Sequence, residues 1–120
     1  MTNKMDSEQA TKIFESLASG IRLDVWRLLV QAGLSGRVAG ELAAELALAP
    51  NTLSFHLKGM VHAGLLSVTQ EGRFLRYRAN LPVMLLLIGY LTEECCAGHP
   101  QTCGIPSKLG CLPEQTDTTT

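Results

Sequence analysis

The sequence lacks an apolar run long enough to cross a membrane. Its longest, residues 81–91, covers about half of the roughly 20 residues that a membrane-spanning helix needs. The first twelve residues are polar and lack the apolar core of a secretory signal, so we expect a cytoplasmic protein without a membrane partner. Aromatic residues are scarce, at 5%, and the formal net charge is only −1. The composition as a whole therefore does not indicate a nucleic-acid partner.

The usual catalytic arrangements are also missing. A thiol-based reductase of the phosphatase type needs a Cys-x5-Arg anion loop, and none of the four cysteines has an arginine six residues on. No Ser/His/Asp set and no pair of carboxylates stands out either. We therefore expect a protein that is not an enzyme and that uses no organic cofactor.

Apolar residues at helical spacing predict three helices in the first half of the chain. The first begins with Ser7 as its N-cap, and the second starts near Gly20 and ends at Gly33. The third presents apolar residues from Val38 to Leu46. With 120 residues, 46% of them hydrophobic, the chain is long enough for one domain with a real core.

A short turn at residues 48–50 leads to a fourth helix, in which Pro50 suits the first position. The apolar residues of this helix share one side, and hydrogen-bonding residues project from the other. Two helices joined by a tight turn, with such an outer face on the second, predict a helix-turn-helix. Two alternating segments, 65–70 and 73–79, then flank Glu71-Gly72 and predict a β-hairpin, or wing.

A last helix is expected from Pro82 to about Cys96. It is apolar nearly all round, and a second copy of the chain would cover it most simply, so we predict a homodimer through the first and last helices. The predicted fold class is mainly α with a small β-hairpin, a winged helix-turn-helix. It occupies residues 1–97 and is followed by a cysteine-containing tail, 98–120, that we expect to be partly disordered.

Basic residues gather around the predicted helix-turn-helix and wing. Between residues 50 and 80 four basic residues accompany a single acidic one, Glu71, which favours contact with double-stranded DNA. The candidate DNA-contacting residues are Asn51, Thr52, Ser54, Phe55, His56, Lys58, Arg73 and Arg76. Each has a solvated surface residue as its alternative. Ser54 is expected nearer the buried side, Phe55 can instead rest against the wing, and Arg76 can instead form a structural salt bridge.

Three of the four cysteines, Cys95, Cys96 and Cys103, fall within nine residues directly after the apolar segment. Thiolates select soft ions, and three of them without a required fourth ligand suit As(III) or Sb(III). Zinc prefers four ligands, and His99 or Cys111 is available to complete such a set. The alternatives that bind no metal are a Cys95 packed into the dimer interface and a disulfide that acts as a redox switch.

Neighbouring residues of a regular helix point about 100° apart, so Cys95 and Cys96 cannot both face one ion from it. Gly98 and Pro100 are expected to end the helix, which lets its last turn unwind and the chain return to deliver Cys103. Cys111 lies further along the tail, and we expect it to be a bystander.

Residues 51–65, NTLSFHLKGMVHAGL, resemble the Ser-His-His-Leu-Lys…Ala-Gly-Leu signature of the ArsR/SmtB-type metalloregulatory repressors, with Phe55 in place of the usual first histidine. Residues 17–23 resemble the entry to the second helix of that family, and residues 72–77 resemble its wing. The resemblance spans residues 7–96. It implies a homodimeric repressor that binds operator DNA and responds to a metal ion.

The familiar metal sites of that family are absent. Residues 37–43 stand where the best-known arsenic sensors carry a Cys-x-Cys box and contain no cysteine, and the zinc-binding Asp/His pattern is missing from residues 82–96. The cysteine cluster resembles instead the arsenic-responsive members with three thiolates at the end of the last helix. This implies a repressor that leaves its operator when As(III) or Sb(III) binds. A repressor of the same fold that responds to zinc, cadmium, lead or thiol oxidation is the alternative.

Overall fold

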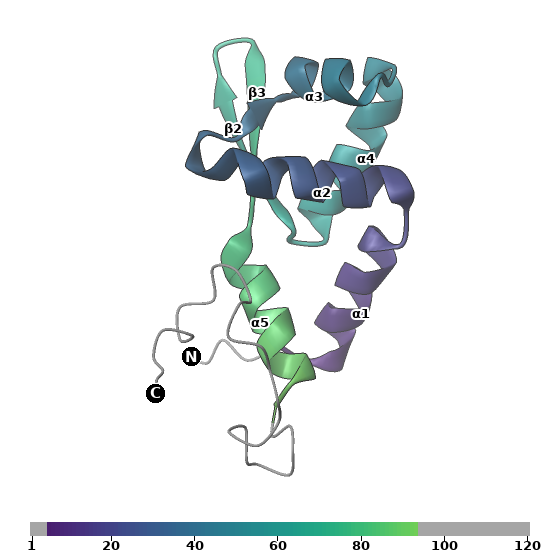
Figure 1. Ribbon diagram of the computed structural model, residues 1–120, viewed down its shortest axis with the longest axis vertical. Helices are drawn as coiled ribbons and strands as arrows, with labels where there is room; N and C mark the ends of the chain where they lie inside the picture. The colour runs from purple at the N-terminus through teal and green to yellow at the C-terminus, as the bar shows by residue number, and fades with distance from the viewer. Residues whose placement is uncertain (1–4, 94–120) are drawn as a thin grey trace.

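The computed structural model describes residues 5–93 and confirms the predicted fold class, mainly α with a small β-hairpin. The elements in chain order are α1 (Ser7–Leu17), α2 (Gly20–Ala32), the 3-10 turn η1 (Gly33–Ser35), β1 (Arg37–Val38), α3 (Ala39–Leu46), α4 (Pro50–His62), β2 (Leu66–Glu71), β3 (Phe74–Ala79) and α5 (Leu81–Leu91) (Figure 1). The strands form one antiparallel sheet in the order β1-β3-β2. Within the described residues no helix is both long and apolar enough to span a membrane.

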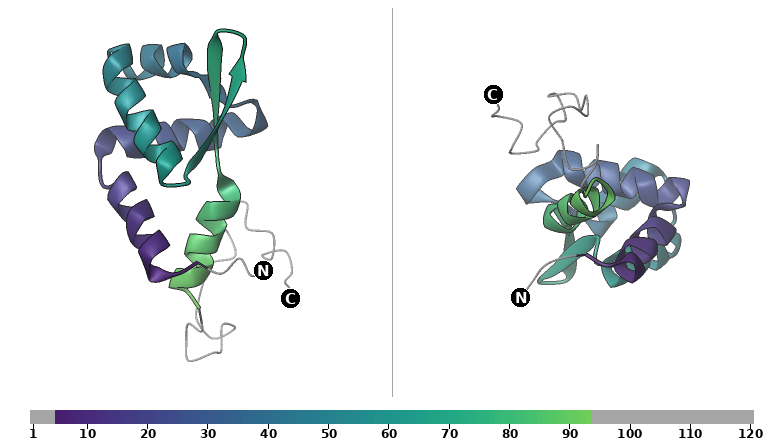
Figure 2. Two further views of the ribbon diagram at one scale, coloured as in Figure 1. Left: turned by 180° about the vertical axis from the view of Figure 1, so that it is seen from behind. Right: turned by 90° about the horizontal axis from the view of Figure 1, so that it is seen from below.

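The two ends of the molecule are built differently. The start of α4 and the tip of the β2–β3 hairpin lie at one end of the long axis (Figure 1). The helices α1 and α5 extend together toward the other end, as the view from behind also shows (Figure 2). The predicted helix-turn-helix with its wing and the predicted dimer helices therefore occupy opposite ends.

The core joins the first four helices to the base of the hairpin. Its largest fully buried side chains are Ile13, Val25, Leu29, Leu42, Leu53, Leu57, Met60 and Leu65. Three of these belong to α4, namely Leu53, Leu57 and Met60, and they share one side of that helix. Burial of this stripe fixes the rotation of α4 and leaves its opposite side facing solvent.

Three predicted helix boundaries were wrong. The N-cap of α1 is Asp6 and not Ser7, because the Asp6 carboxylate accepts from Gln9 N at 2.9 Å while the Gln9 side chain accepts from Asp6 N at 3.1 Å. The third helix begins at Ala39, since the residue before it pairs in the sheet. The last helix begins one residue earlier than predicted and ends at Leu91, short of Cys96.

The strand β1 is a feature that the sequence pattern did not predict. It is two residues long and pairs with β3, with Arg37 opposite Tyr77 and Val38 opposite Arg76. Gly36 precedes it at φ 61°, a conformation that favours glycine. A Cβ at Gly36 would collide with the carbonyl oxygen of Tyr77. The close approach of these two backbones ties the α2–α3 connection to the wing.

Alanine at Gly36 is therefore expected to lower the free energy of unfolding by about 3 kcal/mol, from the left-handed backbone and the clash together. Gly72 provides a matched control, because it has a similar φ of 64° but open space where a Cβ would be added. Gly72→Ala is expected to cost only about 1 kcal/mol. Urea unfolding of both variants measures the difference, and equal losses would show that the contact with Tyr77 contributes nothing.

Candidate nucleic-acid interface

The outer side of α4 carries a row of polar side chains. Asn51, Thr52, Ser54 and Lys58 are all exposed, and none makes a side-chain hydrogen bond to another residue of the described chain. Ser54 had been expected nearer the buried side and is exposed instead, because neighbouring helix residues point about 100° apart and the residue before it, Leu53, takes the buried direction. The row offers donors and acceptors to an external partner.

Phe55 is the most exposed residue of α4 with a large apolar side chain, at 67%. Its ring meets the ring of His56 edge-on, with centroids 5.5 Å apart and planes at 70°. The Arg22 guanidinium lies 5.8 Å from the Phe55 centroid. Phe55 thus contacts Arg22 of α2 and its own neighbour His56, while most of its side-chain surface stays exposed.

The side chain of His56 is held by a residue of α2. Arg22 Nε donates a hydrogen bond to His56 Nδ1 at 3.0 Å. Burial lowers the pKa of His56 below its usual value, and the positive charge of Arg22 lowers this pKa further. The imidazole is therefore neutral at physiological pH and accepts at Nδ1. Arg22 was not among the predicted site residues, and it lies 34 positions from its partner.

Acid is expected to destabilise the protein through His56. The pKa of His56 in the folded protein lies below its unfolded value of 6.5, so the unfolded chain takes up the proton first. The stability that depends on the neutral ring is fully present above the unfolded pKa. It is lost as the pH falls through the lowered folded pKa.

Urea unfolding between about pH 7 and pH 5 measures this loss as a drop in the free energy of unfolding. In His56→Asn, whose amide oxygen can accept from Arg22 and does not titrate, the drop should be smaller. His62→Asn makes the same substitution at an exposed histidine of the same helix and serves as the matched control. Identical profiles for the wild type and His56→Asn would contradict the expectation.

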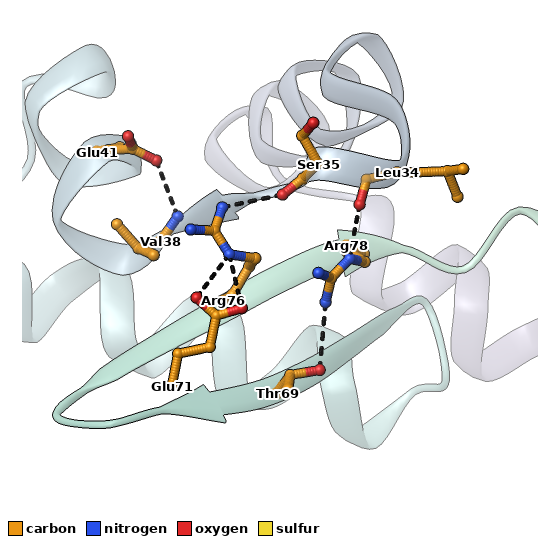
Figure 3. Close-up of polar contacts among 8 residues, drawn as sticks. All are labelled: Leu34, Ser35, Val38, Glu41, Thr69, Glu71, Arg76 and Arg78. Carbon is orange, nitrogen blue, oxygen red and sulfur yellow. Dashed lines mark hydrogen bonds and ion pairs between the residues drawn. The ribbon is translucent and has the colours of Figure 1, made fainter.

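The arginines of the wing have different surroundings. Arg73 is exposed in the two-residue turn between β2 and β3, and within the described residues it has no ion-pair partner. Arg76 Nε instead lies 3.0 Å from Glu71 Oε1, and its Nη1 donates to the carbonyl oxygen of Ser35 at 2.9 Å (Figure 3). The salt-bridge alternative for Arg76 is the arrangement that the structure has.

Arg78 is a second arginine that attaches the wing to η1, and the sequence analysis did not identify it. It donates through Nε to the carbonyl oxygen of Leu34 at 2.8 Å and through Nη1 to Thr69 Oγ1 at 3.2 Å (Figure 3). Arg76 and Arg78 thus both bind η1, the connection that precedes the helix-turn-helix. These contacts hold the hairpin at a set angle to the rest of the interface.

The predicted metal ligands Cys95, Cys96 and Cys103 lie outside the described residues. Between residues 5 and 93 no group of three or more His, Cys, Asp or Glu side chains gathers as a metal site would require. The predicted As(III) or Sb(III) site therefore stays a prediction for the segment after α5.

The exposed surface of α5 is largely apolar. Leu81, Leu85, Ile88 and Leu91 are exposed, the last at 56%, and only Leu87 is buried. Phe14 of α1 is also exposed, at 47%. Within residues 5–93, both of the predicted dimer helices thus carry exposed apolar side chains.

Comparison with known proteins agrees with this architecture. Residues 17–69 match a family model described as a helix-turn-helix domain. A comparison with curated proteins found no match. The likenesses to solved structures extend over most of the chain.

Three similar structures illustrate this. The homodimeric winged helix-turn-helix DNA-binding domain Mb0332 from Mycobacterium bovis, a possible ArsR-family transcriptional regulator, is 23% identical with a TM-score of 0.60, covering 88% of this chain and 99% of that one. An ArsR-like transcriptional regulator from Rhodococcus sp. RHA1 is 22% identical with a TM-score of 0.60, covering 79% and 86%. HlyU from Vibrio cholerae N16961 is 24% identical with a TM-score of 0.58, covering 72% and 97%.

The fold and the interface together define the class: this is a winged helix-turn-helix protein. Residues 17–69 match the helix-turn-helix domain model, and the fold of the chain is that of the ArsR-type transcriptional regulators, as the sequence resemblance implied. The arsenic-responsive branch of that resemblance stays a prediction.

Proposed function

We propose that the chain is a transcriptional repressor that binds operator DNA as a homodimer and dissociates when As(III) or Sb(III) is bound by Cys95, Cys96 and Cys103. The observation that carries the DNA-binding part is the outer side of α4. Its hydrogen-bonding side chains are exposed and unengaged within the described chain, on a helix whose rotation the core fixes.

The shape of this surface suits the major groove. A single α-helix fits that groove, and side chains such as Asn51 and Thr52 near its N-terminal end suit base edges. Lys58 is placed one to two turns further along, where a phosphate contact is expected. The exposed Arg73 at the tip of the wing adds a second positive charge at the same end of the molecule.

The dimer follows from the uncovered apolar surface of α5 and α1. A second copy would bury Leu85, Ile88 and Leu91 against the same helices of its partner, and it would present two α4 helices to successive turns of one DNA face. The M. bovis relative is described as homodimeric. Zinc, cadmium, lead or oxidation of the thiols are the alternative inducers.

DNA binding is tested with a duplex selected from a random pool by the wild-type protein, followed by titration at several salt concentrations. We expect Lys58→Ala to weaken binding about three- to tenfold and to reduce the slope of log K against log salt by about one, as the loss of one phosphate contact requires. Lys12→Ala removes the same charge from α1 and serves as the matched control. Failure to select any duplex, or equal effects of the two variants, would contradict the proposal.

A further inference from the structure

Arg22 of α2 contacts the part of α4 that we propose to bind DNA. It projects from α2 onto α4, where it reaches His56 Nδ1 at 3.0 Å and the ring of Phe55 at 5.8 Å. It also passes Gly59, where an added Cβ would come within 3.3 Å of Arg22 Nη2. Glycine weakens a helix interior, so its presence at this position is consistent with a backbone that leaves room for the guanidinium.

We propose that Arg22 is a positioning residue of α4, which holds His56 as the Nε2–H tautomer and so makes it a hydrogen-bond donor toward DNA. A neutral imidazole has one protonated and one unprotonated nitrogen. Because Nδ1 accepts from Arg22 Nε, the proton is on Nε2. The Phe55 ring packs edge-on against His56 and limits the rotation of the imidazole.

The charge state of His56 agrees with this arrangement. Protonation of His56 Nδ1 would turn this acceptor into a donor that faces the Nε–H donor of Arg22, and their hydrogen bond would be lost. The lowered pKa of His56, caused by burial and then by Arg22, keeps the ring neutral. Arg22 is the one charged group that acts on His56 among the residues of α2 and α4 in the described structure.

The consequence for recognition rests on the proposed function. A free histidine can donate or accept at a base edge, whereas a locked His56 can only donate through Nε2. In the major groove it would then pair with guanine O6 or N7, adenine N7, thymine O4 or a phosphate oxygen, and not with the amino groups of adenine or cytosine. Arg22 would thus select bases without touching DNA.

The proposed tautomer of His56 is tested on the free protein by nitrogen NMR of the histidine rings. The wild type should show His56 with an unprotonated Nδ1 and a protonated Nε2. Arg22→Met removes the guanidinium but keeps an unbranched stem, so both nitrogens should move toward tautomer-averaged shifts and the pKa of His56 should rise toward its ordinary value. His62, exposed on the same helix, is the internal control. A protonated Nδ1 in the wild type, or no change in Arg22→Met, would overturn the proposal.

The recognition step is tested with the duplex selected by the wild type and its single-base variants. His56→Asn places an amide oxygen near the position of Nδ1, so it can still accept from Arg22, but it has no donor near the position of Nε2. We expect it to bind about fivefold more weakly, the change that one ordinary hydrogen bond makes, and to lose discrimination at one base pair or phosphate.

His62→Asn should bind as the wild type does. Unchanged affinity of His56→Asn would overturn the recognition step. If the wild type selects no duplex at all, the proposed function fails, and the NMR result still decides whether Arg22 locks His56.

Discussion

A glutamate in place of Leu85 is expected to convert the dimer into monomers and to lower the affinity for operator DNA by about a hundredfold to ten thousandfold. Leu85 lies in the middle of α5, between the exposed side chains of Leu81 and Ile88 one turn to either side. A carboxylate buried against a second apolar helix would have no partner charge and would oppose association. In a dimer, binding of one subunit to its half-site raises the effective concentration of the second subunit at the other half-site, which strengthens DNA binding. A monomer lacks this contribution.

The oligomeric state is measured by sedimentation equilibrium, and DNA affinity by fluorescence anisotropy with the selected duplex. Phe74→Glu is the matched control, because it also replaces an exposed large apolar residue by glutamate, at the first residue of β3. The tip of the β2–β3 hairpin lies at the end of the molecule opposite α5 (Figure 1). This variant should leave the dimer intact. A Leu85→Glu protein that stays dimeric at micromolar concentration would place the interface elsewhere than on α5.

The elements that the sequence predicted well are those whose signals are local. The buried stripe of α4 and the polar row opposite it follow from a 3.6-residue period within one helix, and Pro50 marks its start. The hairpin follows from alternation on both sides of a turn that contains Gly72. Such features depend on neighbouring residues alone, so they can be read without knowledge of the fold.

The features that were missed depend on residues far apart in the chain. Arg76 and Arg78 bind carbonyl oxygens that lie 41 and 44 positions away, and the Arg22–His56 bond spans 34. The strand β1 has only two residues and exists because β3 pairs with it. The sequence alone does not distinguish an arginine that contacts a phosphate from one that holds the wing against the rest of the domain. The different surroundings of Arg73 and Arg76 can therefore be seen only in the structure.

Saturating As(III) is expected to lower the affinity for operator DNA about 5- to 150-fold, the usual range of coupling between two sites. Cys95→Ser, Cys96→Ser and Cys103→Ser should each remove most of that response, because a serine hydroxyl does not replace a thiolate ligand for a soft ion. Cys111→Ser makes the same chemical change in the same segment and should leave the response intact. Release is followed by anisotropy with the labelled duplex, and undiminished release by Cys95→Ser would contradict the assignment.

The coupling is expected to act through α5. Cys95 follows four positions after Leu91, the last residue of the helix whose apolar surface we assign to the dimer interface. An ion that draws three thiolates together there would change how the ends of the two α5 helices meet, and with it the spacing of the two α4 helices on DNA. Mass spectrometry should show three protons lost per arsenic bound, whereas fewer would exclude a three-thiolate site.

Linkage gives a second, independent measurement of the same coupling. If As(III) weakens DNA binding by a given factor, operator DNA must weaken As(III) binding by that factor. We therefore expect the As(III) affinity of the protein–DNA complex to be lower than that of the free protein by the ratio found in the anisotropy titration. A Leu85→Glu monomer should still bind As(III), but its weak DNA binding should no longer respond, because the interface that transmits the change is absent. A monomer that responds fully would show that the signal reaches α4 within one subunit.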